Sequence, residues 1–196
     1  MKPLILASGS AIRARILTAA GVEFETVKPD VDEDRIKETA ATRSMTVAST
    51  ATMLADAKAL AIRTVDRIVL GSDQILTLDG RAYDKPATMD AARERLRMLS
   101  GKEHQLVNAV SIAKNGEIVF RHLEAPRLFM RRMTDQEIND YLAIAGDEVL
   151  SSVGAYQVEA LGSRLFDRID GDYFAVLGLS LFPVLRYLRE EGMIAF

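Results

Sequence analysis

Apolar and polar positions follow two different periods along the chain, and each period predicts one type of element. Short apolar runs without helical spacing, typical of buried strands, occupy 4–7, 24–27 and 66–71. Apolar residues that recur at steps of three and four, which predict amphipathic helices, occupy 10–20, 46–62, 88–99, 134–145 and 179–190. Helices and strands therefore alternate through much of the sequence.

Two dipeptides typical of tight hairpins interrupt this alternation. Asp79-Gly80 separates strands expected at 75–78 and 81–83, and Asn115-Gly116 separates strands expected at 105–113 and 117–130. Two further strands are expected at 153–160 and 163–169. Since tight hairpins join antiparallel strands, the predicted fold is α/β with a mixed central sheet and flanking helices. With no repeat or linker, residues 1–196 are expected to form one domain, whose hairpin-rich middle makes a smaller second lobe beside a cleft.

Composition excludes several classes of function. Lysine and arginine number 25 against 28 acidic residues, a net charge of −3, so no basic surface for nucleic acid is expected. The absence of cysteine excludes disulfides, thiolate metal sites and a cysteine nucleophile, and two histidines argue against a histidine-rich zinc site. No apolar stretch approaches the ~20 residues of a membrane span, and the first apolar run is too short for a signal peptide. A cytoplasmic protein that binds neither membrane nor nucleic acid is expected.

The opening segment has the composition of a phosphate-binding turn. An apolar run ends in Ser8-Gly9-Ser10, and Arg13 lies one turn into the helix that follows. Two hydroxyls, backbone N–H groups and the positive helix end meet at such a turn, where an anion can bind. Alternatively, Ser10 only caps the helix and Arg13 lies on the surface. The P-loop pattern is absent.

Lys58 interrupts an apolar helix face formed by Val47, Ala51, Leu54 and Ile62. It is either a cation directed into a cleft or a lysine that extends from the core to solvent. His104 is interpreted as a loop or core histidine rather than a base.

Three more charged residues have both a chemical and an ordinary interpretation. Asp73 follows the carboxyl end of the predicted strand 66–71 and suits metal or base chemistry, or it caps a turn. Lys85 precedes Pro86, which favours an extended backbone that presents the lysine to a phosphate, or it is an exposed charge after a hairpin. Glu33 lies in the acidic loop predicted at 29–33 and could contribute a carboxylate to Mg²⁺, or it belongs to a solvated loop.

These residues together resemble the Maf (septum-formation) family of nucleoside triphosphate pyrophosphatases along nearly the whole chain. The motifs that carry the resemblance, in chain order, are Leu6-Ala7-Ser8-Gly9-Ser10-Ala11-Ile12-Arg13, Asp32-Glu33, Ala57-Lys58-Ala59, Gly71-Ser72-Asp73-Gln74, Asp84-Lys85-Pro86, Leu99-Ser100-Gly101-Lys102-Glu103-His104 and Gly154-Ala155-Tyr156-Gln157-Val158-Glu159. Each motif is short, and their order and spacing together are specific.

The resemblance implies a fold, a reaction and a set of site residues. The fold would have two lobes around a deep groove, and the reaction would convert a nucleoside triphosphate to a monophosphate and pyrophosphate with Mg²⁺ or Mn²⁺. A homodimer is also implied. Asp73 would be the proton acceptor, and Glu33 with Asp73 would form the metal site. The expected substrate contacts are Ser8, Ser10, Arg13, Lys58 and Lys85.

Base preference is expected to depend on Ile12, Gln74 and Glu159. Gln74 and Glu159 resemble the branch that acts on 7-methyl-GTP rather than the dTTP/UTP branch, and a glutamate can accept hydrogen bonds from a guanine-type base. Ile12 replaces a larger residue common there. Other departures from the family pattern are Ala11 for proline, Asn108-Ala109 for Thr-Gly, 173–176 for an asparagine-containing stretch, and Ser180 for proline.

Two other functions fit parts of the pattern. A non-catalytic, nucleotide-binding regulator of cell division would keep the cations and lose the acids, so the presence of Asp73 and Glu33 favours an enzyme. A purine triphosphatase of the inosine-triphosphate type is disfavoured by the serine–arginine opening and by the Asp-Lys-Pro motif. The favoured interpretation is a house-cleaning pyrophosphatase with a link to septum formation.

Overall fold

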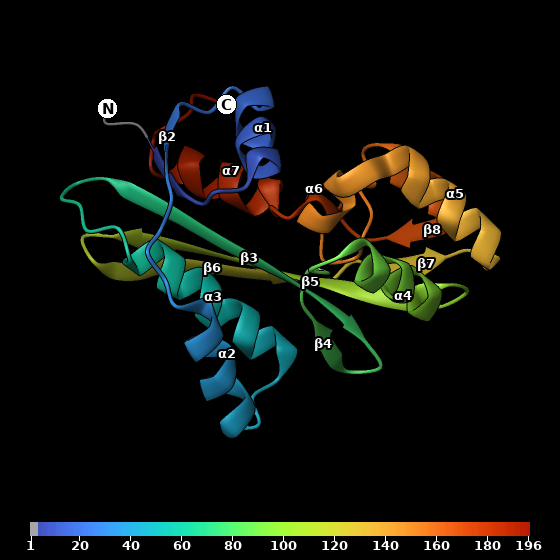
Figure 1. Ribbon diagram of the computed structural model, residues 1–196. Coiled ribbons are helices and arrows are strands. Elements are labelled where there is room, and N and C mark those ends of the chain that lie inside the picture. Colours follow the sequence, from blue (N-terminus) through green and yellow to red (C-terminus); the bar gives the residue numbers. More distant parts are fainter. Residues whose placement is uncertain (1–3) are drawn as a thin grey trace. The chain divides into compact units, whose positions relative to one another are not determined.

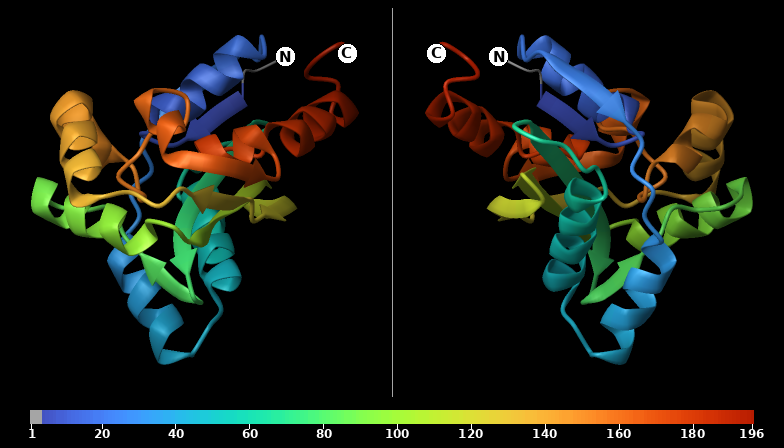
Figure 2. Two further views of the ribbon diagram at one scale, coloured as in Figure 1. Left: turned by 90° about the vertical axis from the view of Figure 1, so that its right-hand side faces the viewer. Right: turned by 90° about the vertical axis from the view of Figure 1, so that its left-hand side faces the viewer.

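The computed structural model describes residues 4–196, which form a mixed sheet with helices packed against it (Figures 1 and 2). The strands are β1 (Leu4–Ala7), β2 (Phe24–Val27), β3 (Ile68–Leu78), β4 (Arg81–Tyr83), β5 (Glu103–Lys114), β6 (Glu117–Glu124), β7 (Arg127–Met130) and β8 (Phe166–Asp170). The α-helices are α1 (Ala11–Ala19), α2 (Glu33–Thr42), α3 (Val47–Leu60), α4 (Met89–Leu99), α5 (Asp135–Ala145), α6 (Tyr173–Leu177) and α7 (Leu181–Glu190). Two 3₁₀ helices, η1 (Gly146–Ser151) and η2 (Leu161–Leu165), complete the elements. The predicted mixed α/β fold is confirmed.

The chain divides into two compact units. Unit 1 contains the described residues up to Gln74 together with 107–124 and 178–196, and unit 2 contains 75–106 and 125–177. Strands β3 and β5 each contribute residues to both units. The prediction of one domain with two lobes stays a prediction.

Unit 1 contains the parallel part of the sheet. Strand β1 pairs in parallel with β2 and with β3, and β6 pairs antiparallel with β5. Helices α1 and α7 lie on one side of these strands and α3 lies on the other, with α2 beside α3 (Figure 1). Part of the core of this unit is made by Ile5, Ala7, Ala59, Val69 and Ala113. Because helices cover both sides, β1 and most of β3 are buried.

Unit 2 is built from antiparallel pairs. Strand β4 pairs with the end of β3, β7 pairs with β5, and β8 pairs with β7. Helices α4 and α5 pack together and both contact η1. The core of this unit includes Leu76, Leu96, Leu128, Leu142 and Tyr156.

Local sequence signals are confirmed where they act over a few residues. Asp79-Gly80 and Asn115-Gly116 both have positive φ at both positions, which is the backbone of the tight hairpin turn that these dipeptides favour. Thr134 begins α5 with a complete capping box, in which Glu137 accepts a hydrogen bond from the Thr134 N–H.

Strand β3 corrects the prediction that a strand ends at Gly71. It runs unbroken through Ser72 and Asp73 to Leu78, so Asp73 lies inside a strand and neither ends it nor caps a turn. The polar residues are tolerated there because each has a partner within unit 1: Ser72 donates to the Gly178 carbonyl, and Asp73 accepts from Lys58.

Other predicted boundaries also shift. Glu33 begins the unpredicted helix α2 rather than ending a loop, because Asp32 caps the helix by accepting from the Arg35 N–H. The predicted strand 117–130 is divided into β6 and β7 around Pro126, which has no N–H to donate.

The predicted strands in the late segment are largely wrong. Residues 153–160 form turns, in which Ala155 has a φ of 59°, and residues 161–165 form η2 before β8 begins. The unpredicted helix α6 follows β8, and α7 begins at Leu181 rather than at 179. Among residues 4–196, no helix is long and apolar enough to cross a membrane.

Candidate active site

Asp73 is a buried carboxylate on β3. Its side chain is about 10% exposed, in a strand whose neighbouring residues are mostly buried and apolar. A buried charge is costly unless it is paired, so its partner determines what the site can do. Residues alternate between the two faces of a strand, so Gly71 and Asp73 share the face that packs against α3, whereas Ser72 lies on the opposite face.

Lys58 on α3 is the partner of Asp73. Its Nζ donates to Asp73 Oδ1 at 2.6 Å and forms an ion pair with Glu33 Oε1 at 3.0 Å. The Lys58 side chain is 9% exposed, so the interpretation that it extends from the core to solvent is wrong. The alternative interpretation, a cation directed into a cleft, stays a prediction, and the structure pairs this cation with two acids within unit 1.

Glu33 reaches Lys58 from the first turn of α2. A carboxylate in this position is favoured by the positive end of the helix dipole, and Glu33 remains 44% exposed. Two carboxylates thus converge on one ammonium group, one from inside the sheet and one from its solvent side.

The close contact between α3 and β3 depends on Gly71. A Cβ atom at this position would lie 2.3 Å from the Ala55 carbonyl oxygen and 2.7 Å from the Ala59 N. Helix and strand therefore approach each other more closely than a side chain would allow. This approach brings Lys58, near the end of α3, to the strand that carries Asp73.

The opening turn is organised by Ser8. Its buried Oγ accepts hydrogen bonds from the Ser10 N–H at 3.1 Å and from Arg13 Nη1 at 3.2 Å. Ser10 occupies the N-cap position of α1, and its side chain makes no capping hydrogen bond. The interpretation that Ser10 only caps the helix is therefore wrong.

Arg13 is held between this turn and the segment before α7. Its Nε donates to the Gly178 carbonyl oxygen at 2.7 Å, and the same oxygen accepts from Ser72 Oγ at 3.0 Å. Burial lowers the pKa of Arg13 below its usual range, and the negative charges of Asp73 and Glu33 oppose this shift. The guanidinium therefore lies in the electrostatic field of the two carboxylates, and the interpretation of Arg13 as a surface arginine is wrong.

Unit 1 thus brings together Ser8, Ser10, Arg13, Glu33, Lys58 and Asp73, with Ile12 and Gln74 as sequence neighbours of Arg13 and Asp73. The predicted residues Lys85 and Glu159 belong to unit 2, where both are exposed. Sequence reasoning missed Ser72 and Gly178, since a serine hydroxyl and a glycine carbonyl give no signal before the fold places them.

The turns that lead to Glu159 are anchored inside unit 2. His104 Nε2 lies 2.6 Å from the Tyr156 hydroxyl, and Tyr141 donates to the Ala155 carbonyl oxygen at 3.3 Å. Burial raises the pKa of Tyr141 to about 12 and also raises that of Tyr156, so both hydroxyls stay protonated. His104 is 2% exposed, which confirms it as a core histidine.

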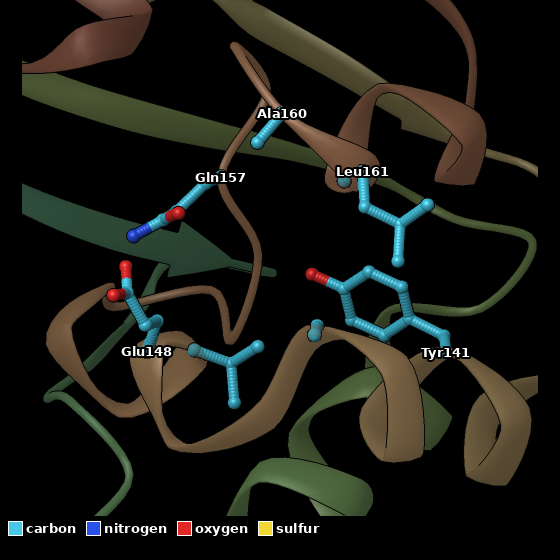
Figure 3. A pocket seen from close by; sticks show the side chains of 8 residues that line it. Tyr141, Glu148, Gln157, Ala160 and Leu161 are labelled. Carbon is cyan, nitrogen blue, oxygen red and sulfur yellow. The ribbon is translucent and has the colours of Figure 1, made fainter.

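A pocket in unit 2 lies beside these turns (Figure 3). Tyr141, Glu148, Gln157 and Leu161 line it, together with backbone and small side chains. Its volume of about 100 Å³ is below the range of roughly 300–1,000 Å³ that drug-sized ligands occupy. This pocket is therefore too small to enclose a nucleotide.

Acid should destabilise the protein through His104. Burial lowers its pKa from 6.5 to about 4, so between these two pH values the unfolded state binds more protons than the folded state. We expect the free energy of unfolding to be highest above pH 6.5 and to fall toward pH 4, by at most about 3 kcal/mol from this residue. Urea denaturation at pH 7, 5.5 and 4.5 measures the loss.

The loss should be smaller in His104→Gln and should persist in His122→Gln, a histidine on the edge strand β6. An identical acid loss in the wild type and His104→Gln would contradict the assignment.

The family model described as Maf-like protein matches residues 3–191. A nucleoside triphosphate pyrophosphatase of Hyphomonas neptunium is 46% identical over 185 residues, which cover 94% of this chain and 93% of the relative. A protein of the same name from Rhodopseudomonas palustris is 45% identical over 100% of this chain and 96% of its own. A 7-methyl-GTP pyrophosphatase of Rhizobium meliloti is 43% identical over 99% of each chain.

Proposed function

Because the chain belongs to the Maf-like protein family, we propose that it is a nucleoside triphosphate pyrophosphatase, an enzyme that hydrolyses a nucleoside triphosphate to the monophosphate and pyrophosphate. The observation that carries this proposal is the buried pair of Lys58 and Asp73, with Glu33 on the same ammonium group. A non-catalytic binding protein would have no use for two acids placed among phosphate-binding cations.

The reaction divides naturally between acids and cations. Asp73 accepts the proton of a water molecule as the water oxygen bonds to the α-phosphorus, and the bond from this phosphorus to the bridging oxygen breaks. Pyrophosphate leaves with the electrons of that bond. In phosphoryl transfer most of the acceleration comes from positioning and charge neutralisation, so the cations matter as much as the base.

The phosphates are proposed to bind at the opening turn. Arg13 offers a planar guanidinium with five donors, and Ser8 and Ser10 supply hydroxyls beside the N-terminus of α1. Lys58 adds a second cation, which is buried. The resemblance adds Lys85 as a further phosphate contact.

A divalent cation, Mg²⁺ or Mn²⁺, fits the acids in unit 1. Glu33 and Asp73 offer hard oxygen donors that both lie within bonding distance of the Lys58 ammonium, and Mg²⁺ takes one or two carboxylates together with substrate phosphates. Residues 4–196 contain no group of three or more acids or histidines suited to a metal ion, so substrate oxygens would complete the shell. Such an ion would neutralise charge on the phosphates.

A guanine-type base, as in 7-methyl-GTP, is the proposed substrate preference. Glu159 can accept hydrogen bonds from the N1–H and exocyclic amine of guanine, and Ile12 and Gln74 are proposed to complete the selection. The relative from Rhizobium meliloti, which is named 7-methyl-GTP pyrophosphatase, supports this choice. We further propose a cytoplasmic homodimer with a house-cleaning role linked to septum formation.

A nucleotide panel tests the function. Rates with 7-methyl-GTP, GTP, dTTP, UTP and CTP are measured in the presence of Mg²⁺ or Mn²⁺, and both products are identified. We expect pyrophosphate and the monophosphate in equal amounts, with the highest kcat/KM for 7-methyl-GTP. Glu159→Gln can accept fewer hydrogen bonds from guanine, so it should lower the ratio of 7-methyl-GTP to dTTP activity by about 10-fold.

Release of inorganic phosphate in place of pyrophosphate would contradict the reaction. Absence of any turnover with tight nucleotide binding would indicate the regulator instead.

A further inference from the structure

The segment 178–180, between α6 and α7, supports two residues of the proposed site. The carbonyl oxygen of Gly178 accepts hydrogen bonds from Arg13 Nε at 2.7 Å and from Ser72 Oγ at 3.0 Å. Arg13 is a proposed phosphate contact, and Ser72 immediately precedes Asp73 in β3. One backbone oxygen therefore accepts hydrogen bonds from α1, which carries Arg13, and from β3, which carries Asp73.

Gly178 presents this oxygen through an unusual backbone conformation. Its φ of 106° lies in a region that residues with a Cβ atom rarely adopt. A Cβ atom would meet Arg13 Nε at 3.7 Å, which is ordinary contact, so backbone conformation rather than space requires glycine here. The direction of the carbonyl group thus depends on how the residues that follow are held.

Asn108 and Ser180 hold the other end of the segment. Both are fully buried, and Asn108 Oδ1 accepts from the Ser180 N–H at 3.1 Å and from Ser180 Oγ at 2.9 Å. Asn108 Nδ2 has no hydrogen-bond partner in the described part of the chain. A buried donor without a partner destabilises the fold, so packing alone does not account for an asparagine here.

The two residues are also departures from the family pattern, and the structure brings them into direct contact within unit 1. A proline at position 180 would have no N–H and no hydroxyl to donate. The contact between Asn108 and Ser180, called the anchor below, therefore depends on residues in which this chain departs from the family pattern.

We propose that Asn108 and Ser180 are positioning residues that hold the Gly178 carbonyl, and through it the Arg13 guanidinium, in the orientation that binds the triphosphate. The inference rests on the proposed function. With Nε on Gly178 and Nη1 on Ser8, the plane of the guanidinium is fixed and its remaining donors are directed by that plane. Without the anchor, the guanidinium plane of Arg13 can change its orientation, whereas the positive charge of the group remains.

Ser180→Pro tests the anchor. Ser180 has a φ of −67°, the value that proline adopts, so the change keeps the backbone angle. It removes both hydrogen bonds to Asn108, and the ring carbon that replaces the N–H hydrogen displaces Asn108 Oδ1. The probe is inorganic triphosphate with Mg²⁺, whose dissociation constant is measured by calorimetry in the wild type, Ser180→Pro, Arg13→Gln and the double variant. kcat and KM for the preferred nucleotide are measured alongside.

The expected result is a coupling between the two sites. Ser180→Pro should weaken triphosphate binding by about 5- to 10-fold when Arg13 is present and by less than about 2-fold in the Arg13→Gln background. KM should rise more than kcat falls. A purely structural role would instead lower the melting temperature and leave the affinity of the folded protein unchanged.

Two further variants keep the test decisive. Ser180→Ala retains the backbone bond to Asn108, so it should fold and show a smaller, still Arg13-dependent loss of about 2-fold. Thr77→Val is the matched control, because the buried Thr77 hydroxyl has no hydrogen-bond partner among residues 4–196 and its removal should not change affinity.

Equal losses with and without Arg13, or unchanged affinity in both Ser180 variants, would overturn the inference. A wild type that binds triphosphate but releases no pyrophosphate would contradict the proposed function alone. A wild type that does not bind triphosphate would overturn both.

Discussion

Asp73→Asn should lower kcat by about 10²- to 10⁴-fold, the range over which a positioned general base contributes. Asparagine has nearly the same shape, and its Oδ1 can still accept the hydrogen bond that Lys58 Nζ donates at 2.6 Å. It cannot take a proton from water. Lys58 also keeps its ion pair with Glu33, so its charge remains compensated. Nucleotide affinity should therefore change by less than about 3-fold, and the variant should fold.

Single-turnover hydrolysis and calorimetric binding of a non-hydrolysable analogue separate the two effects. Asp79→Asn is the matched control, because Asp79 is an exposed residue of the β3–β4 turn with a φ of 52°, a conformation that asparagine adopts readily. It should retain full activity. Wild-type turnover in Asp73→Asn would remove Asp73 from the role of base.

Gly71→Ala should destabilise the fold by about 3 kcal/mol or more. The added methyl group would lie 2.3 Å from the Ala55 carbonyl oxygen and 2.7 Å from the Ala59 N, and both are backbone atoms of α3. Backbone cannot rotate away as a side chain can, so α3 must move off β3. That movement also separates Lys58 from Asp73. Chemical denaturation should show the loss of stability, and the folded fraction should have reduced activity.

Gly9→Ala is the control for stability. A Cβ atom at Gly9 meets nothing within 4 Å, so this change should alter the free energy of unfolding by no more than about 1 kcal/mol. Equal stability of Gly71→Ala and the wild type would show that α3 and β3 can separate without cost, and the close contact would then not position Lys58.

The candidate site was predictable to the extent that its residues break a local pattern. Lys58 is visible because it interrupts an apolar helix face, and Asp73 because it follows an apolar run. The sequence misplaced Asp73 at the end of a strand, because the partners that let a carboxylate stay inside a strand come from α3, 15 residues earlier. Gly178 could not be found at all, and Asn108 stood out only as a departure from the family pattern, since their contacts are 165 and 72 residues away.

In the late segment, secondary structure also depends on contacts with residues that are distant in the sequence. Its apolar residues favour strands at 153–160, whereas the structure has turns there, held by His104, Tyr141 and Arg95 from other elements. The turn at Asn115-Gly116 was predicted correctly, because these two residues by themselves favour the backbone conformation of the turn.

By itself, the sequence determined the mixed α/β class, the hairpins, most helices and the family, because these follow from periods, turn dipeptides and motif order over short distances. Only the tertiary structure decided that Asp73 lies inside β3, that Glu33 begins a helix, and that Lys58 joins both acids. These outcomes depend on whether a buried charge meets a partner that is distant in the chain, and no local pattern contains that information.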